Sequence, residues 1–372
     1  MALGTIDTNQ IASEAVTVPK VTDQVLSNRN LIINGAMTVH QRGNQVTAGS
    51  TSVYFLDRWN IYHNTAAAAN LQQSTVVPAG QGFGNSMLID CTTADTSVAA
   101  GDVAVLRQII EGQNLQQLAY GTSSAKSITL SFWVRSTKTG AYNCEIYHND
   151  SQARTQSHQY TISQADTWEK KEITFSGDTS ASIDNDNQAT FYVQWSLIAG
   201  TDYTSGSQAT TWTNLDNTKR FTGQVNFFDN TNNNFYLTGV QLEVGVQTPF
   251  EHEDIGTTLS KCQRYYNDTR SGGSSYGGVV MTHSVYATYA YGTSVFPTEM
   301  RAKPTVVFYD GPGTAGTITE NGAANNRGVV ANSTSKYAIV GMQSNNTGSG
   351  NFSQSAGSGY HLFGTYTASA EL

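Results

Sequence analysis

Charged side chains are scarce in this chain, and the shortage limits what the protein can bind. Only 13% of the 372 residues are Asp, Glu, Lys or Arg, well below the roughly 25% of a typical soluble globular protein. The formal net charge is −8, and the sequence contains no run of Lys or Arg. Because binding to phosphates needs a clustered positive field, no nucleic-acid partner is expected.

Long apolar runs and paired cysteines are also lacking. No apolar stretch approaches the roughly 18 residues that cross a bilayer, and the first residues lack the basic and apolar regions of a secretory signal. We therefore expect no membrane insertion, and folding in a cytoplasm. Cys91, Cys144 and Cys262 have neither paired nor metal-type spacing, which predicts reduced and mostly buried thiols.

Catalytic signatures are the third absence. The sequence has no nucleophile elbow, phosphate-binding loop, zinc-binding spacing or kinase signature, so it predicts no catalytic residue and no metal site. A glycan-cleaving enzyme would need two carboxylates that face each other across a cleft. Glu111, Glu145, Asp184 and Asp186 are available, but the sequence does not bring any two of them together.

Apolar and polar residues alternate along most of the chain, as in half-buried β-strands. Between residues 31 and 250, Ile128, Leu130, Phe132 and Val134 should face a core while Trp133 faces outward. Similar runs occur at 143–148, 159–162, 168–175, 190–197 and 235–242, separated by turn-forming clusters. This pattern predicts a two-layer β-sandwich, with one helical interruption at 105–119.

Three further segments flank this sandwich. Residues 1–30 carry Ile11, Val18, Val21 and Val25 on a thin strip that cannot bury itself, although a disordered tail would look the same. Residues 253–270 place Ile255, Leu259 and Cys262 on one face of a short helix, with Thr257 and Thr258 as caps. Residues 271–372 are rich in Gly, Ser and Asn, with short strands that predict a smaller β domain.

Six stretches of sequence carry a family resemblance. They are 29–43, 56–59, 239–251, 259–266, 300–306 and 368–372, and the first reads RNLIINGAMTVHQRG. In this order they resemble the carbohydrate-binding-module-like jelly roll, helix, tip and terminus of tailed-bacteriophage fibre or spike proteins. The resemblance implies an all-β protein with an N-terminal extended anchor (1–30), a β-sandwich of the jelly-roll type (31–252), a short helical linker (253–270) and a C-terminal β tip domain (271–372).

The resemblance also implies a function and an assembly. It implies a non-enzymatic virion structural protein, assembled in the host cytoplasm, that contributes to host attachment through surface glycans. A homotrimer would bury the apolar strip of the N-terminal segment and the face of the short helix, and the N-terminal segment would dock on other virion proteins. The expected trimer interface comprises Ile11, Val18, Val21, Val25, Ile255, Leu259 and Cys262. The alternatives are a capsid decoration, cement or head-fibre protein, and a glycan depolymerase.

Aromatic side chains are the candidate glycan contacts, because sugar rings stack on Trp and Tyr. We predict Tyr276, Tyr289 and Tyr291 near the tip, and Trp133 and Tyr147 on the sandwich. Core packing or an oligomer interface is the alternative for each of them. Jelly rolls of this family often hold a structural calcium through an acid on the last strand. The matching segment 236–240 has no carboxylate, which argues against that calcium and leaves no expected cofactor.

Overall fold

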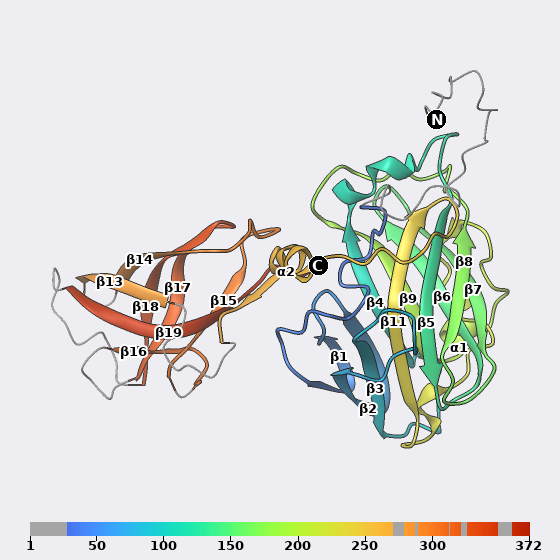
Figure 1. Cartoon of the computed structure of the whole chain (residues 1–372), viewed down its shortest axis with the longest axis horizontal. Coiled ribbons are helices and arrows are strands. Elements are labelled where there is room, and N and C mark those ends of the chain that lie inside the picture. The colour runs from blue at the N-terminus through green and yellow to red at the C-terminus, as the bar shows by residue number, and fades with distance from the viewer. Residues whose placement is uncertain (1–27, 271–278, 287–288, 312, 321–325, 349–358) are drawn as a thin grey trace, which may run out of the picture.

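The protein folds into two β lobes that meet at a short helix (Figure 1). The computed structural model describes residues 28–270, 279–286, 289–311, 313–320, 326–348 and 359–372. The predicted all-β architecture, with a sandwich, a short helix and a smaller C-terminal β domain, is confirmed. The predicted anchor at residues 1–30 falls almost entirely outside the described residues, as do Ile11, Val18, Val21 and Val25.

The larger lobe contains strands β1 to β11. They are β1 (Gln45–Tyr54), β2 (Asn60–Ser74), β3 (Ser86–Thr93), β4 (Val103–Glu111), β5 (Ile128–Ser136), β6 (Gly140–Asn149), β7 (Ala153–Ile162), β8 (Glu169–Phe175), β9 (Ala189–Ala199), β10 (Thr213–Asn214) and β11 (Asn234–Val244). All pairs are antiparallel, in the order β10-β7-β6-β9-β4-β2-β3-β11-β5-β8, with β1 paired to β2. The one-turn helix α1 (Thr201–Thr204) follows β9.

The long strand β2 belongs to both layers of the sandwich. Its first part, Asn60 to Asn64, pairs with β4, and its second part, Ala68 to Ser74, pairs with β3. One layer is therefore β10, β7, β6, β9 and β4, and the other is β3, β11, β5 and β8. The core lies between them, with Trp59, Trp195 and Phe132 fully buried and their rings in contact.

The predicted alternation in β5 is confirmed, because Ile128, Leu130, Phe132 and Val134 are buried in the core while Trp133 lies on the outer face. The helix predicted at 105–119 is wrong. Residues up to Glu111 form β4, and two 3-10 turns follow at Gly112–Asn114 and Gln116–Leu118. Both faces of β4 are covered, so its apolar run lacks the period of two and resembles a buried helix.

The smaller lobe contains β12 (Tyr266–Asp268), β13 (Val279–Tyr286), β14 (Tyr289–Val295), β15 (Thr305–Tyr309), β16 (Thr317–Glu320), β17 (Asn326–Thr334), β18 (Ala338–Gly348) and β19 (Gly359–Ser369). Strand pairing closes into a ring, because β19 bonds both β13 and β16. Phe308, Ile339 and Met342 lie in its separate core. Since β12 pairs with β19, the end of the predicted linker 253–270 is part of this sheet.

Helix α2 (Ile255–Gln263) joins the lobes, and its N-cap is Asp254, whose carboxylate accepts hydrogen bonds from the backbone of Gly256 and Thr257. The expected Thr caps are therefore displaced by an acid one turn earlier, which also suits the positive end of the helix dipole. None of the helices in the described ranges has the length and apolar character to cross a bilayer.

Candidate functional site

The outer face of the β6-β9-β4 layer carries an open groove of about 290 Å³. Strand alternation explains its composition, because residues that alternate with the core side chains of β9 and β4 must point outward. Helix α1 and the segment that follows it form the second wall. The lining residues are Tyr62, Val103, Val105, Arg107, Tyr147, Tyr192, Gln194, Tyr203, Leu215 and Arg220. We call this the tyrosine groove.

Four tyrosine rings line the tyrosine groove. Tyr147 of β6 and Tyr192 of β9 are directly paired across the two strands, with ring centroids 5.2 Å apart. Tyr62 of β2 and Tyr203 of α1 are partly exposed on either side. None of the four hydroxyls has a hydrogen-bond partner among the residues that the structure describes. Burial, reinforced by Tyr192, raises the pKa of Tyr147, so its hydroxyl stays protonated and can donate a hydrogen bond.

Arg220 holds one wall of the groove in place. Its guanidinium makes a two-pronged ion pair with the buried Glu145, at 2.8 Å from Nε to Oε1 and 2.7 Å from Nη2 to Oε2. Thr155 and Gln194 donate two further hydrogen bonds to the same carboxylate. Burial opposes the charge on Arg220, but Glu145 outweighs it and raises the pKa of Arg220. Both carboxylate oxygens of Glu145 are therefore occupied.

Arg107 of β4 lies at the other end of the groove. Its Nε donates a 2.8 Å hydrogen bond to the side-chain oxygen of Asn60, and its guanidinium lies 5.3 Å from the ring of Tyr62 and 5.6 Å from that of Tyr192. Within the described ranges no carboxylate forms an ion pair with it, and burial lowers its pKa. The groove thus combines aromatic faces, free hydroxyls and one uncompensated cation, which suits a polar ligand with apolar C–H faces.

Of the predicted glycan contacts on the sandwich, only Tyr147 lies in the tyrosine groove. Trp133 is on the outer face of the opposite layer, where it pairs with Thr238 and Lys170. Sequence reasoning missed Tyr62, Tyr192 and Tyr203. The alternation of buried Phe191 and Val193 with Tyr192 was a usable signal, whereas Tyr62 and Tyr203 join the groove only through nonlocal packing.

Near the tip, Tyr289 and Tyr291 lie on one face of β14, because Ala290 between them is in the core. Tyr291 is 38% exposed, and its ring lies against Gly341, where an added Cβ would sit 3.1 Å from the ring. The shared face of the two tyrosines is therefore present. Tyr276 lies outside the described residues.

The three helical residues assigned to a trimer interface differ in exposure. Ile255 is 55% exposed and Leu259 is half-buried, so both remain free to contact a partner. Cys262 is fully buried within its own chain, so its assignment to the interface is wrong. The helical period places Cys262 on the same stripe, but that stripe turns inward against the sandwich at its C-terminal end.

Five of the six stretches that carry the family resemblance place polar residues at the junction between the lobes, and the sixth, 239–251, anchors the loop before β1 within the sandwich. Glu251 accepts hydrogen bonds from the backbone nitrogens of Arg29 and Asn30, at 2.8 and 3.0 Å. Asn34 bridges the backbone of Val39 and Asp57 with bonds of 2.9 to 3.1 Å. Glu251 therefore fixes the loop before β1 to the segment after β11, and Asn34 fixes the same loop to the turn before β2, so both have structural roles.

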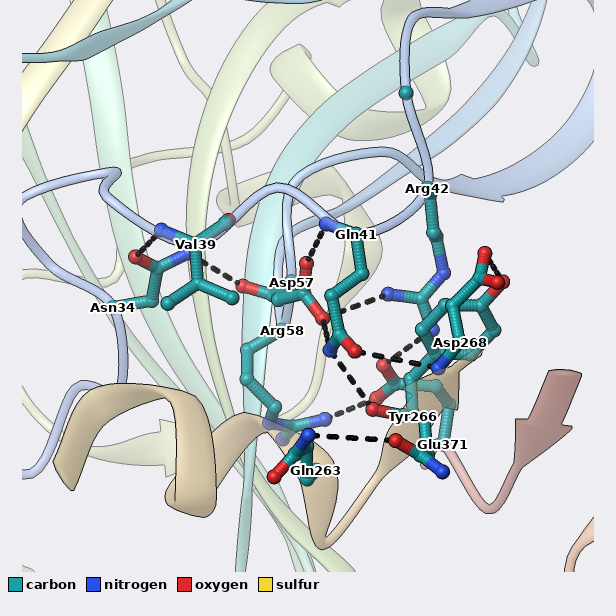
Figure 2. A network of polar contacts seen from close by, with 12 residues as sticks. Asn34, Val39, Gln41, Arg42, Asp57, Arg58, Gln263, Tyr266, Asp268 and Glu371 are labelled. Carbon is teal, nitrogen blue, oxygen red and sulfur yellow. Dashed lines mark hydrogen bonds and ion pairs between the residues drawn. The ribbon is translucent and has the colours of Figure 1, made fainter. Parts of the chain in front are cut away.

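Two arginines of the sandwich meet an acid from residues 368–372 (Figure 2). Arg42 bonds Glu371 at 2.8 Å and stacks over the ring of Tyr266 at 3.5 Å. Arg58, only 1% exposed, pairs with the same carboxylate and stacks over Tyr265 at 3.5 Å. The stretches 56–59, 259–266 and 368–372 therefore converge on one cluster, which we call the Glu371 clamp.

Glu111 forms a second link across the junction. Its buried carboxylate accepts bonds of 2.9 and 2.8 Å from Arg264 and a further bond from the Tyr265 hydroxyl. Burial alone would raise its pKa, but these bonds and the charge of Arg264 lower the pKa of Glu111 below its usual value. Glu111 lies four residues beyond Arg107 on β4. Glu145 and Arg107 are both register partners of Gln194, on either side of β9, so Glu145 lies at the level of Arg107 along the strands. The two carboxylates therefore do not face each other.

The described residues contain no group of three or more His, Cys, Asp or Glu side chains placed to hold a metal ion. Asp184 and Asp186 lie in a loop whose backbone accepts hydrogen bonds from Gln113 and Gln116. The geometry of the described acids therefore assigns no ligand set.

No protein-family model matches the sequence, and no curated protein sequence matches it. Among solved structures, the chain is similar to tailspike protein 4 of bacteriophage CBA120, with 12% identity over 58% of this chain and a TM-score of 0.31. The chain spans 21% of that tailspike. It is also similar to a CBM4 structure, with 13% identity over 57% of this chain and 98% of that chain and a TM-score of 0.30. A third similar structure is TmCBM61 in complex with β-1,4-galactotriose, with 10% identity over 59% of this chain and 100% of that chain and a TM-score of 0.28. At these TM-scores the similarities carry no argument about function.

Proposed function

We propose that the tyrosine groove binds a glycan and that the protein is a non-enzymatic attachment subunit of a tailed-bacteriophage fibre or spike. The observation that carries the glycan assignment is the set of four tyrosines with unpartnered hydroxyls around an open groove. Stacking on the rings of Tyr147 and Tyr192 would cover the C–H faces of a sugar, and the hydroxyls and Gln194 would bond its polar groups.

The groove supports binding better than cleavage. General acid catalysis needs a carboxyl group that is free to give a proton to the glycosidic oxygen. The Glu145 side chain beneath the groove is saturated by Arg220, Thr155 and Gln194, so it has no free oxygen to do so. Release of reducing ends from polysaccharide by the wild-type protein would contradict a non-enzymatic role.

The virion assignment depends on the sequence resemblance of the six stretches alone. The proposed assembly is a homotrimer whose residues 1–30 dock on other virion proteins. Light scattering of the purified chain should return a trimer, and removal of residues 1–30 should leave folded protein that no longer enters particles. Antibody labelling of virions would place the chain on the tail; labelling of the shell would instead support a decoration or head-fibre protein.

Tyr147→Ala with Tyr192→Ala tests the groove itself. Loss of two stacking surfaces of about 1 kcal/mol each should weaken saccharide binding at this groove by roughly thirtyfold. Tyr337→Ala is the matched control, because Tyr337 is a 54% exposed tyrosine in the other lobe. The measurement is binding to an array of immobilised linear tri- to hexasaccharides, with circular dichroism to confirm the fold. Equal binding by the double variant and the control would refute the assignment.

A further inference from the structure

A second groove, of about 410 Å³, lies on the opposite layer of the sandwich. It is lined by residues of β5, β8 and β11 and of the segments that precede β3 and follow β11: Gln81, Phe83, Ser131, Trp133, Lys170, Gly239, Gln247, Pro249, Phe250 and His252. No residue is shared with the tyrosine groove. We call it the Trp133 groove.

A backbone irregularity forms one wall of the Trp133 groove. The pairing of β11 with β5 shifts between Thr238 and Gln241, and Gly239 within this bulge has a φ of +61°. A Cβ at Gly239 would lie 2.5 Å from the Cζ atom of Phe83. Only glycine therefore lets Phe83 lie directly against the strand, and the bulge makes room for a ring where a regular strand would present a side chain.

Three rings form this wall together. Phe83 contacts Phe250 at 4.9 Å and His252 at 5.4 Å between ring centroids, and Phe250 contacts His252 at 5.0 Å. Each ring is therefore held by the other two, across more than 160 residues of sequence. The wall is fixed before any ligand arrives, which lowers the entropy cost of binding.

Trp133 and Lys170 form the opposite side. They are a directly paired couple on β5 and β8, and both side chains point away from the core. In the part of the chain that the structure describes, the Trp133 indole nitrogen and the Lys170 amine have no hydrogen-bond or ion-pair partner. A partly exposed indole next to free donors is an arrangement that core packing does not require.

We propose that the Trp133 groove is a second glycan-binding site, in which one pyranose unit stacks on Trp133 and is bonded by Lys170 and Gln247. The alternation of strands places the two grooves on opposite outer faces, so one sandwich can hold two glycan chains at once. The inference is independent of the proposed function, because each groove can bind without the other.

Tryptophan fluorescence distinguishes the two grooves. The tyrosine groove is lined by no Trp, and Trp59 and Trp195 are fully buried. The saccharide that binds best on the array described above should be titrated into the full chain. We expect a shift in Trp emission with the wild-type protein and with the Tyr147→Ala, Tyr192→Ala variant, and none with Trp133→Phe.

Calorimetry with the same saccharide should give two sites per chain for the wild type and one for either groove variant. Trp133→Ala should weaken the second site at least about tenfold, and Trp133→Phe, which keeps a smaller ring and the fold, should have an intermediate effect. The inference is overturned if Trp133→Ala binds the saccharide as the wild type does, or if no saccharide on the array loses affinity in this variant. Either result leaves the glycan assignment of the tyrosine groove unaffected. Concentration-dependent association that Trp133→Ala abolishes, without saccharide binding, would identify a contact between copies instead and also overturn it.

Discussion

Glu371→Gln should destabilise the protein far more than its small change in volume suggests. The Glu371 carboxylate neutralises two guanidiniums, those of Arg42 and Arg58, whose side chains are 9% and 1% exposed. The substitution removes the negative charge and leaves both cations in a poorly hydrated site. Breaking a buried ion pair by removal of one partner costs about 3–5 kcal/mol, because the remaining charge is uncompensated.

The structure places this variant near the lower end of that range. Arg42 keeps Asp57 at 3.7 Å and the ring of Tyr266, and Arg58 keeps the Ile109 carbonyl and the ring of Tyr265. The glutamine oxygen can still accept one hydrogen bond. We therefore expect a loss of about 3 kcal/mol in the free energy of unfolding, which corresponds to a fall of roughly 6–12 °C in Tm for a lobe as large as the sandwich.

Differential scanning calorimetry at pH 7 measures this change. Glu172→Gln is the matched control, since it makes the same chemical change at an exposed residue that has no ion pair among those described. The control should melt within about 1 °C of the wild type, as isolated surface charges contribute little. If Glu371→Gln melts with the control, the clamp is not a stabilising contact and the reasoning fails.

Three further outcomes follow from the same contacts. The pKa of Glu111 is lowered in the folded state, so its contribution to stability is complete above the ordinary carboxyl pKa and is lost as pH falls through the folded pKa. Glu111→Gln should therefore flatten part of the decline of Tm below about pH 4.5. An unchanged profile of Tm against pH would contradict this. Arg107 should favour glycans that carry carboxylates, so affinity for an acidic oligosaccharide should fall as NaCl is raised from about 0.05 to 0.5 M. Arg107→Gln should remove this salt dependence, and equal salt dependence in the variant would contradict the prediction. Replacement of Tyr289 and Tyr291 with Ala should reduce adsorption to host cells without changing the oligomer; unchanged adsorption would assign both tyrosines to packing.

The parts of the fold that depend on local periodicity could be predicted from the sequence. The alternation in β5 predicted which residues face the core, and the stripe on α2 predicted the helix. β4 was mistaken for a helix because both of its faces are covered, so its sequence carries no period of two. The exposure of Cys262 on α2 was also mispredicted. Its burial depends on Arg58 and other residues about 200 positions away in the sequence.

The candidate site was predicted only in part, for a related reason. Tyr147 could be chosen because an aromatic on a predicted strand must face one side or the other. The groove around it depends on β9 lying between β6 and β4, and on Arg220 folding back onto Glu145. Neither strand order nor the path of that loop is encoded in local spacing. Five of the six resemblance stretches contribute polar residues that bond across the junction, so they depend on the whole fold.

The junction also determines how the small lobe is held under load. The chain passes once from the sandwich to the small lobe, through α2, and the segment after β19 returns to this junction near the end marked C (Figure 1). There the backbone nitrogen of Ala370 donates a hydrogen bond to the carbonyl of Tyr265. Arg301 adds a third tie, since its guanidinium bonds the carbonyls of Asn187, Ala370 and Glu371. A force applied to the small lobe is therefore shared by one covalent connection and by the ion pairs and hydrogen bonds that hold residues 370–372 against the sandwich. We therefore expect the junction to be rigid and to transmit torque from one lobe to the other, whereas a single flexible linker would let the lobes rotate independently.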